Sequence, residues 1–346
     1  MNKKLLASTA LVGSLMLAGS VNAQTSITGS LAIVYQGLSN SKDNVGTQKS
    51  QSGFGRESQV NVSNKGKLNT GTDYVAGFSL EFDGNSSASA TEVTSISNEN
   101  LYIDFITGNT TLTVGVDHVQ NSANLVTPTA YGSAAGVFDG QHSVAFTDAV
   151  GANPKESMGV GIMQTIPGAG RLSAYFVPER GDVGNRDTRI GTTGEGSAFE
   201  IGFRGNAGVN GLDVKAFYNK GKKADTLSDD PNAVSLGFAY KIGALSFGAD
   251  RLVNDGPLNA DEKKSYMFGA AYNVSKDIAV SAHRFTGKTE AVPGVSNTDE
   301  NGYHLAVGYN LGPVALGATF TRVDNRGFLA SNGDAELFTV ALSTNF

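Results

Sequence analysis

The chain ends with the stretch DAELFTVALSTNF, residues 334–346, and this ending indicates the fold. Its apolar residues Phe338, Val340, Leu342 and Phe346 are separated by residues that are small or polar. Side chains of a β-strand point alternately to its two faces, so this spacing puts the apolar residues on one face. An apolar face towards lipid and a polar face towards water are typical of a transmembrane β-barrel strand. A strand of a soluble β-sandwich would alternate in the same way, so the rest of the chain has to decide between the two.

The N-terminus has the pattern of an export signal. Lys3 and Lys4 precede an apolar run at residues 5–18, and Val21-Asn22-Ala23 has small residues at the positions that a signal peptidase reads. We therefore predict a Sec signal peptide at residues 1–23, removed after Ala23, and a mature chain of residues 24–346. A membrane anchor is the alternative, but the run is shorter than the roughly 20 residues that a spanning helix needs.

The composition is that of an exported chain without disulfides. The 346 residues include 44 glycines, 8 prolines, no cysteine and no tryptophan, and 40% of them are hydrophobic. A low apolar fraction is expected when half of each strand faces water. Without cysteine, the hydrogen bonds between strands must hold the fold. The net charge of −6 becomes −8 when Lys3 and Lys4 leave with the acid-free signal peptide, so nucleic acid is not an expected partner.

Alternation of the same kind recurs through the mature chain and predicts sixteen strands. Two clear apolar sets are Tyr74, Ala76, Phe78, Leu80 and Phe82, and Val234, Leu236, Phe238 and Tyr240. Short connections such as 108–109, 167–170, 241–244, 273–277 and 310–313 alternate with longer ones near 37–53, 84–97, 179–196, 220–231, 253–263, 287–299 and 324–334. Bacterial single-chain barrels have an even strand number, short periplasmic turns and longer external loops. We therefore predict an all-β fold, a 16-stranded antiparallel transmembrane β-barrel.

One segment leaves the strand count open. Residues 142–149, HSVAFTDA, alternate like a short strand, and including them would give seventeen strands. An odd number would put the two ends of the chain on opposite sides of the membrane and exchange short turns with long loops. We therefore assign this segment to a third external loop at residues 119–156, by far the longest connection. The alternative is that it is a true strand and that another predicted strand is not.

The signal peptide, the sixteen alternating segments, the long third external loop and the terminal Phe346 together resemble the general porins of Gram-negative outer membranes. The resemblance covers residues 24–346 and is one of architecture, since only the terminal strand is motif-like. It implies a homotrimer of water-filled channels for passive diffusion of small hydrophilic solutes and ions. It also implies that loop 119–156 folds into the lumen, with acidic residues facing basic residues on the wall. The loop departs from many members of the family: residues 131–139 read YGSAAGVFD in place of a Pro-Glu-Phe-Gly-Gly type segment.

Charged residues of inward parity are the candidates for selecting solutes. Such a pore needs fixed charges at a narrow point, where low-dielectric walls strengthen their field. We predict the acidic side of the constriction at Asp117, Asp139, Asp148 and Glu156, and the basic side on the wall at Arg204 and Lys215. The other inward acids, bases and histidines are Glu57, Asp73, Glu81, Asp104, Glu200, Lys241, Asp250, His283 and His304. For each residue the alternative is a solvated charge that selects nothing. The negative net charge predicts a weak cation preference.

Four arginines have the parity of lipid-facing residues but lie near the external ends of their strands: Arg56, Arg251, Arg284 and Arg322. Guanidinium groups pair bidentately with phosphate, and charge is tolerated near membrane interfaces. We therefore predict that some of them contact lipopolysaccharide in the outer leaflet. The alternative is a slip of parity at the strand ends that would turn them into the vestibule.

Other functions find less support in the sequence. The four histidines, His118, His142, His283 and His304, do not lie in a motif of a hydrolase, so no catalytic residue is expected. No cofactor or metal site is expected either, since scattered loop carboxylates such as Asp229 and Asp230 are usually solvated. A substrate-specific channel and a surface binding or adhesion barrel remain the alternatives. Few inward aromatics and moderate loops favour the general diffusion pore over both.

Overall fold

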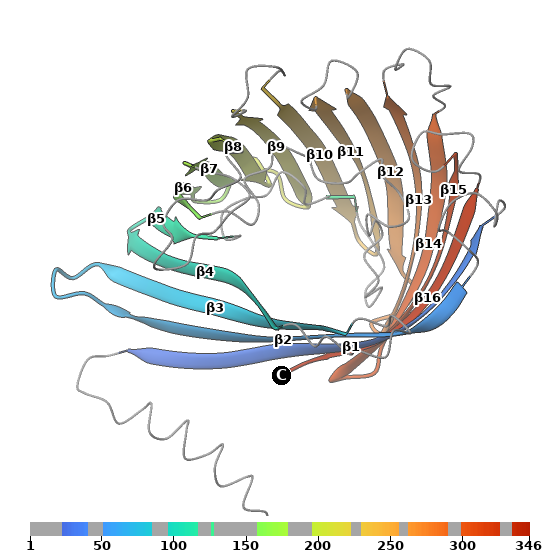
Figure 1. The fold of residues 1–346 in the computed structure, drawn as a ribbon, viewed down its shortest axis with the longest axis horizontal. Helices are drawn as coiled ribbons and strands as arrows, with labels where there is room; N and C mark the ends of the chain where they lie inside the picture. The colour runs from blue at the N-terminus through green and yellow to red at the C-terminus, as the bar shows by residue number, and fades with distance from the viewer. Residues whose placement is uncertain are drawn as a thin grey trace, which may run out of the picture.

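Alternating side chains along the described part of the chain form sixteen antiparallel strands, and the strands close into a barrel (Figure 1). This computed structural model describes residues 23–40, 51–84, 96–116, 126–127, 158–178, 196–222, 230–255, 262–289, 299–325 and 334–346. The strands are Gln24–Asn40 (β1), Gln51–Lys67 (β2), Asp73–Gly84 (β3), Ile96–Thr107 (β4), Thr110–Gly115 (β5), Gly159–Ile166 (β6), Gly170–Val177 (β7), Ala198–Gly205 (β8), Leu212–Gly221 (β9), Asn232–Ile242 (β10), Leu245–Asp255 (β11), Lys263–Asn273 (β12), Ile278–Thr289 (β13), Glu300–Asn310 (β14), Val314–Asp324 (β15) and Ala335–Asn345 (β16).

Each strand pairs with its neighbours in sequence, and β16 pairs with β1 to close the ring. The closure extends to the last residue: Gly29 N donates to Phe346 O at 2.8 Å, and Phe346 N donates to Gly29 O at 3.0 Å. A Cβ atom on Gly29 would lie 2.5 Å from Phe346 Cζ. Glycine at position 29 therefore makes room for the terminal ring. The predicted sixteen-stranded antiparallel barrel is confirmed.

The two faces of the wall differ as the alternation predicts. On β14, Leu305, Val307 and Tyr309 are 43–47% exposed on the outer face. Between them on the inner face, His304 and Ala306 are no more than 7% exposed. The outer face thus carries the large apolar side chains that lipid requires.

Short and long connections alternate at the two ends of the barrel. At the end that holds Gln24 and Phe346, every connection between strands has six residues or fewer: 68–72, 108–109, 167–169, 206–211, 243–244, 274–277 and 311–313. The connections at the opposite end are longer, and the longest joins β5 to β6 across residues 116–158. The predicted alternation of turns and loops is confirmed.

The long connection between β5 and β6 leaves no gap in the wall. Strand β5 pairs directly with β6, from Thr110 opposite Gln164 to Gly115 opposite Gly159, so no further strand stands between them. Of the predicted loop 119–156, only Val126 and Thr127 are described, and both are buried. The predicted signal peptide, apart from Ala23, and the segment 142–149 lie outside the described residues.

Two features of the wall differ from a simple reading of the alternation. Strands β1 and β2 each have 17 residues, longer than their apolar positions indicate. The register of β3 against β4 shifts between Gly77 and Ser79, and Asn100 on β4 has a positive φ of 51°. The register shift and the positive φ of Asn100 both fit a β-bulge, in which one strand inserts an extra residue. In the described part of the chain, no helix has the length and apolar character needed to span a membrane.

Candidate functional site

A row of charged side chains crosses the inner face of the wall from β7 to β11. The strand registers place Arg171 opposite Arg204, Arg204 opposite Lys215, Lys215 opposite Gly237 and Gly237 opposite Asp250. Directly opposite residues on neighbouring strands have Cβ atoms about 4.5–5.5 Å apart. The row therefore brings three cations and one carboxylate into a continuous band around the inside of the barrel.

Lys215 and Asp250 form a buried ion pair within this band. Lys215 Nζ lies 3.2 Å from Asp250 Oδ1, and the two side chains are 0% and 1% exposed. Gly237 stands between them on β10, where a Cβ atom would lie 2.3 Å from Asp250 Oδ1. The missing side chain at Gly237 lets the lysine and the aspartate meet across an intervening strand.

Asp250 also holds two residues of the long β5–β6 connection against the wall. Its Oδ2 accepts hydrogen bonds from Val126 N at 3.0 Å, from Thr127 N at 2.8 Å and from Thr127 Oγ1 at 2.5 Å. Val126 Cγ2 would lie 2.7 Å from a Cβ atom on Gly237, so these two residues sit directly on β10 and β11. A carboxylate that accepts several N–H bonds makes strong, charge-assisted contacts. The Lys215–Asp250 pair is therefore the attachment point of residues 126–127.

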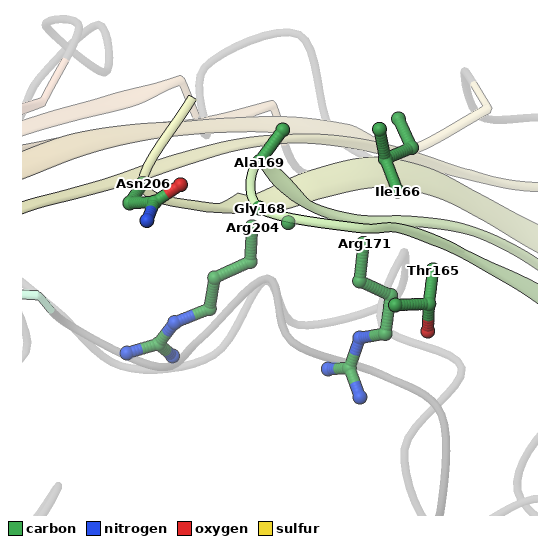
Figure 2. A pocket seen from close by; sticks show the side chains of 8 residues that line it. Thr165, Ile166, Gly168, Ala169, Arg171, Arg204 and Asn206 are labelled. Atoms are coloured by element: carbon green, nitrogen blue, oxygen red, sulfur yellow. The ribbon is translucent and has the colours of Figure 1, made fainter. Parts of the chain in front are cut away.

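Arg171 and Arg204 lie nearer the short-turn end of the same row. Arg204 Nη2 is 3.2 Å from Asp213 Oδ2 on β9, and the Arg204 side chain is 30% exposed. An open pocket of about 500 Å³ is lined by Thr165, Ile166, Gly168, Ala169, Gly170, Arg171, Arg204 and Asn206. Figure 2 shows both guanidinium groups and the Thr165 side chain on one side of the strands, away from Ile166.

Acidic residues occupy the inner face of another part of the wall. Glu57 on β2, Glu81 on β3 and Asp104 on β4 share the inward parity, and Asp104 is 7% exposed. In Figure 1 these strands run along one side of the ring, and β9 to β12 lie across from them. The inner face thus carries acidic residues on β2 to β4 as well as the charged row on β7 to β11.

Two histidines of inward parity form a stacked pair on β13 and β14. His283 lies opposite His304, with ring centroids 5.5 Å apart and an interplanar angle of 24°. His304 Nδ1 is 2.8 Å from Thr321 Oγ1 on β15. Nearby, Leu252, Met267, Phe285 and Val323 form a buried apolar cluster on the inner face. The inner face is thus not uniformly polar, which the alternation alone did not indicate.

The four arginines at the outer rim all lie on the outer face. Each is opposite an outward residue on a neighbouring strand: Arg56 opposite Ile33, Arg251 opposite Leu236 and Tyr266, Arg284 opposite Phe268 and Tyr303, and Arg322 opposite Tyr303 and Glu336. The Arg251 guanidinium lies 5.6 Å from the centre of the Tyr266 ring. These positions are the lipid-facing ones expected from parity.

Arg322 differs from the other three because carboxylates surround it. Its guanidinium lies 3.0 Å from Asp324 Oδ1, 3.2 Å from Glu336 Oε1 and 3.6 Å from Asp334 Oδ2. An arginine already paired with three carboxylates has little left to offer a phosphate. Arg251 and Arg284 are thus better placed to meet an anionic headgroup.

The structure brings together only the basic half of the predicted site. Arg204 and Lys215 are neighbours on the inner wall, but Lys215 is buried against Asp250. The predicted acidic residues Asp117, Asp139, Asp148 and Glu156 lie outside the described residues. The sequence predicts Asp250 as an inward residue without indicating its role, and the predicted site does not include Arg171. Arg171 directly precedes the outward Leu172, so the alternation of the strand indicates that Arg171 points inward. Within the described ranges no group of three or more acids, histidines or cysteines could hold a metal ion.

Comparisons with known proteins agree with this architecture. A family model described as Gram-negative porin matches residues 7–327. Two engineered variants of the porin of Rhodopseudomonas blastica have similar structures, with TM-scores of 0.62 and 0.61 at 16% and 17% sequence identity. Each alignment covers 93% of this chain and 100% of the variant. No curated protein sequence matched the chain.

Proposed function

From the premise that the chain belongs to the Gram-negative porin family, and is therefore a channel of the outer membrane, we propose that small hydrophilic solutes and ions diffuse passively through its barrel. The apolar outer face and the charged inner face of the described strands support this proposal. A diffusion pore needs no catalytic group; it needs a wetted lumen and a narrow point that limits solute size.

The observation that carries the proposal is the attachment of residues 126–127 to the inner wall. Both residues belong to the longest connection between strands, and both are buried against Asp250. A connection fixed to the wall at this point is kept inside the barrel there, where it takes up part of the cross-section. We infer that loop 119–156 narrows the lumen and that its acids Asp139, Asp148 and Glu156, with Asp117 at its base, form one side of the constriction.

The constriction proposal predicts a weak cation preference that depends on the loop acids. Conductance and reversal potential of the purified mature protein should be measured in planar bilayers under a salt gradient. We expect large conductance steps with modest cation preference, and loss of that preference in the double variant Asp139→Asn with Asp148→Asn. If the double variant keeps the full cation preference, Asp139 and Asp148 do not determine it. No conductance from correctly folded protein would favour a surface binding barrel instead.

We further propose that the mature protein is a homotrimer, exported with a Sec signal peptide at residues 1–23. The family resemblance supports the trimer, and a small outward residue such as Ala76 would let barrels pack closely, whereas Gly29 is covered by the Phe346 ring. Unheated samples on a denaturing gel should then run as a trimer, and heated samples as a monomer. A monomer band without heating would contradict a stable trimer.

Lipopolysaccharide is the proposed partner of the outer-rim arginines. Arg56, Arg251 and Arg284 lie on the outer face among apolar residues, and Arg322 lies there among carboxylates. We expect Ala substitution of Arg251 and Arg284 to reduce the lipopolysaccharide that co-purifies with the protein, and Ala substitution of Arg322 to have little effect. Unchanged retention in a variant lacking all four arginines would refute the contact.

A further inference from the structure

The pair of arginines at the short-turn end of the inner wall has a geometry that a general diffusion pore does not require. Arg171 on β7 lies directly opposite Arg204 on β8. Like charges directly opposite on neighbouring strands destabilise a sheet. Figure 2 shows both side chains extending to the same side of the strands, with a gap between the two guanidinium groups and Arg204 leaning away from Arg171. Their placement therefore costs free energy unless a negative charge lies between them.

The described residues offset only part of this charge. Asp213 pairs with Arg204 at 3.2 Å, and Asp250 pairs with Lys215. Arg171 makes no ion pair with any described residue. Lys215 and Asp250 balance each other, and the third inward carboxylate of these strands, Glu200, lies four residues from Arg204 towards the other end of β8. At the short-turn end, Arg171 and Arg204 are thus accompanied by one carboxylate, Asp213, which leaves one positive charge there.

The backbone beneath the two arginines is held in place by glycine contacts. A Cβ atom on Gly205 would lie 2.2 Å from Gly170 Cα, and one on Gly170 would lie 2.6 Å from Arg204 O. Gly170 has a φ of +147°, and Ala207 N donates to Ala169 O at 2.8 Å. The β6–β7 turn is thus clasped against the start of the β8–β9 turn. This clasp holds the backbone at Arg171 and Arg204 close together, so that both side chains start from a common base.

Further donors line the same pocket. Asn206 Oδ1 accepts a hydrogen bond from Gly208 N at 3.0 Å, which leaves its amide nitrogen as a donor. Thr165 contributes a hydroxyl group on the side of the guanidinium groups. The pocket is open and has a volume of about 500 Å³, so a ligand there would keep contact with water. Two forked guanidinium groups with neutral donors at the edge match the several oxygens of a phosphate.

We propose that Arg171 and Arg204 form an anion subsite for a phosphate group at the short-turn mouth of the channel. The ligand is a small solute, either inorganic phosphate or a phosphomonoester. Arg171 and Arg204 each donate to the phosphate oxygens, and the dianion offsets the repulsion between the two guanidinium groups. The subsite rests on the proposed function only in that the channel brings solutes to it. A pore with overall cation preference would thus hold a local site for phosphate.

The test is the block of single-channel current by inorganic phosphate at constant ionic strength. Wild-type current should fall with phosphate concentration, and Arg171→Gln or Arg204→Gln should raise the half-blocking concentration roughly tenfold, since one charge-assisted interaction is lost. Arg171→Lys should lie between, because lysine keeps the charge and loses the fork. The matched control is Lys241→Gln, which removes one inward cation from β10 at the same short-turn end of the barrel. It should leave the phosphate block nearly unchanged. Glycerol phosphate in place of phosphate tests whether the subsite accepts an ester.

The outcomes separate the subsite from the channel. Equal effects of Arg171→Gln and Lys241→Gln would overturn the subsite and leave a general electrostatic effect. The subsite would also be overturned if the wild type conducts without phosphate block and the detergent-solubilised protein does not broaden the phosphate signal in a ³¹P NMR titration. That result would leave the proposed channel function intact. Absence of conduction would instead count against the proposed function, and the same NMR titration with the Arg171→Gln variant would still decide the subsite.

Discussion

Asp250 is the residue on which the inner wall and the long connection both depend. It pairs with buried Lys215 and accepts hydrogen bonds from residues 126 and 127. We expect Asp250→Ala to destabilise the barrel by about 3–5 kcal/mol, because it removes the carboxylate that pairs with the buried lysine charge. Thermal unfolding followed by circular dichroism measures this loss. Single-channel records should also show larger and noisier currents, since residues 126–127 lose their attachment.

A second variant separates the two roles of Asp250. Replacing the whole pair, as Lys215→Met with Asp250→Leu, should restore much of the stability, because an apolar pair of similar volume is often neutral. It should not restore steady currents, since no acceptor remains for Val126 and Thr127. Gly237→Ala should disturb the currents as well, and Gly55→Ala is its control, with no atom closer than 4.0 Å to the added Cβ. A double variant with wild-type currents would show that residues 126–127 do not depend on Asp250.

Among the elements, the pairing of β1 with β16 is the one that closes the ring. Removing Phe346 deletes two backbone hydrogen bonds to Gly29 and the ring that covers it. We expect a loss of roughly 2–4 kcal/mol, from about 1 kcal/mol per hydrogen bond and the lost ring contact. The temperature at which the folded band disappears on a denaturing gel should fall accordingly. Gly29→Val should act in the same direction, whereas Gly37→Ala, with nothing within 4 Å of its Cβ, should not. An unchanged transition in the Phe346 deletion would mean that β1 and β16 close without it.

How far the sequence predicts each element depends on whether its two faces differ chemically. Strands such as β14 alternate cleanly between lipid and lumen, so parity alone placed Leu305 outside and His304 inside. The apolar cluster of Leu252, Met267 and Phe285 lies on the inner face, where the alternation gives no signal for it. The Asp250 attachment joins residues more than 120 positions apart, and only the closed barrel brings them together. Local periodicity therefore predicts the wall, and long-range contacts decide the site.

For the whole molecule, the remaining question is how far its negative charge governs ion flow. The predicted mature chain, residues 24–346, would carry −8, and salt screens any charge that is distant from a passing ion. The Debye length is about 30 Å at 0.01 M and about 3 Å at 1 M salt. If distant charges set the cation preference, the permeability ratio from reversal potentials should fall steeply over this range. A ratio that stays constant would contradict this and assign the preference to charges at a constriction.

The arginine pair gives an independent check on the same question, because its charge lies on the inner wall. Removing both guanidinium groups, as Arg171→Gln with Arg204→Gln, should raise the cation preference at low and at high salt alike, since an ion passing the pocket lies within a few ångströms of them. Removing two outer-face charges instead, as Arg251→Gln with Arg284→Gln, changes the net charge equally but should alter the ratio only at low salt. Equal behaviour of the two double variants would mean that the net charge of the molecule, and not the placement of charges on the inner wall, determines which ions pass.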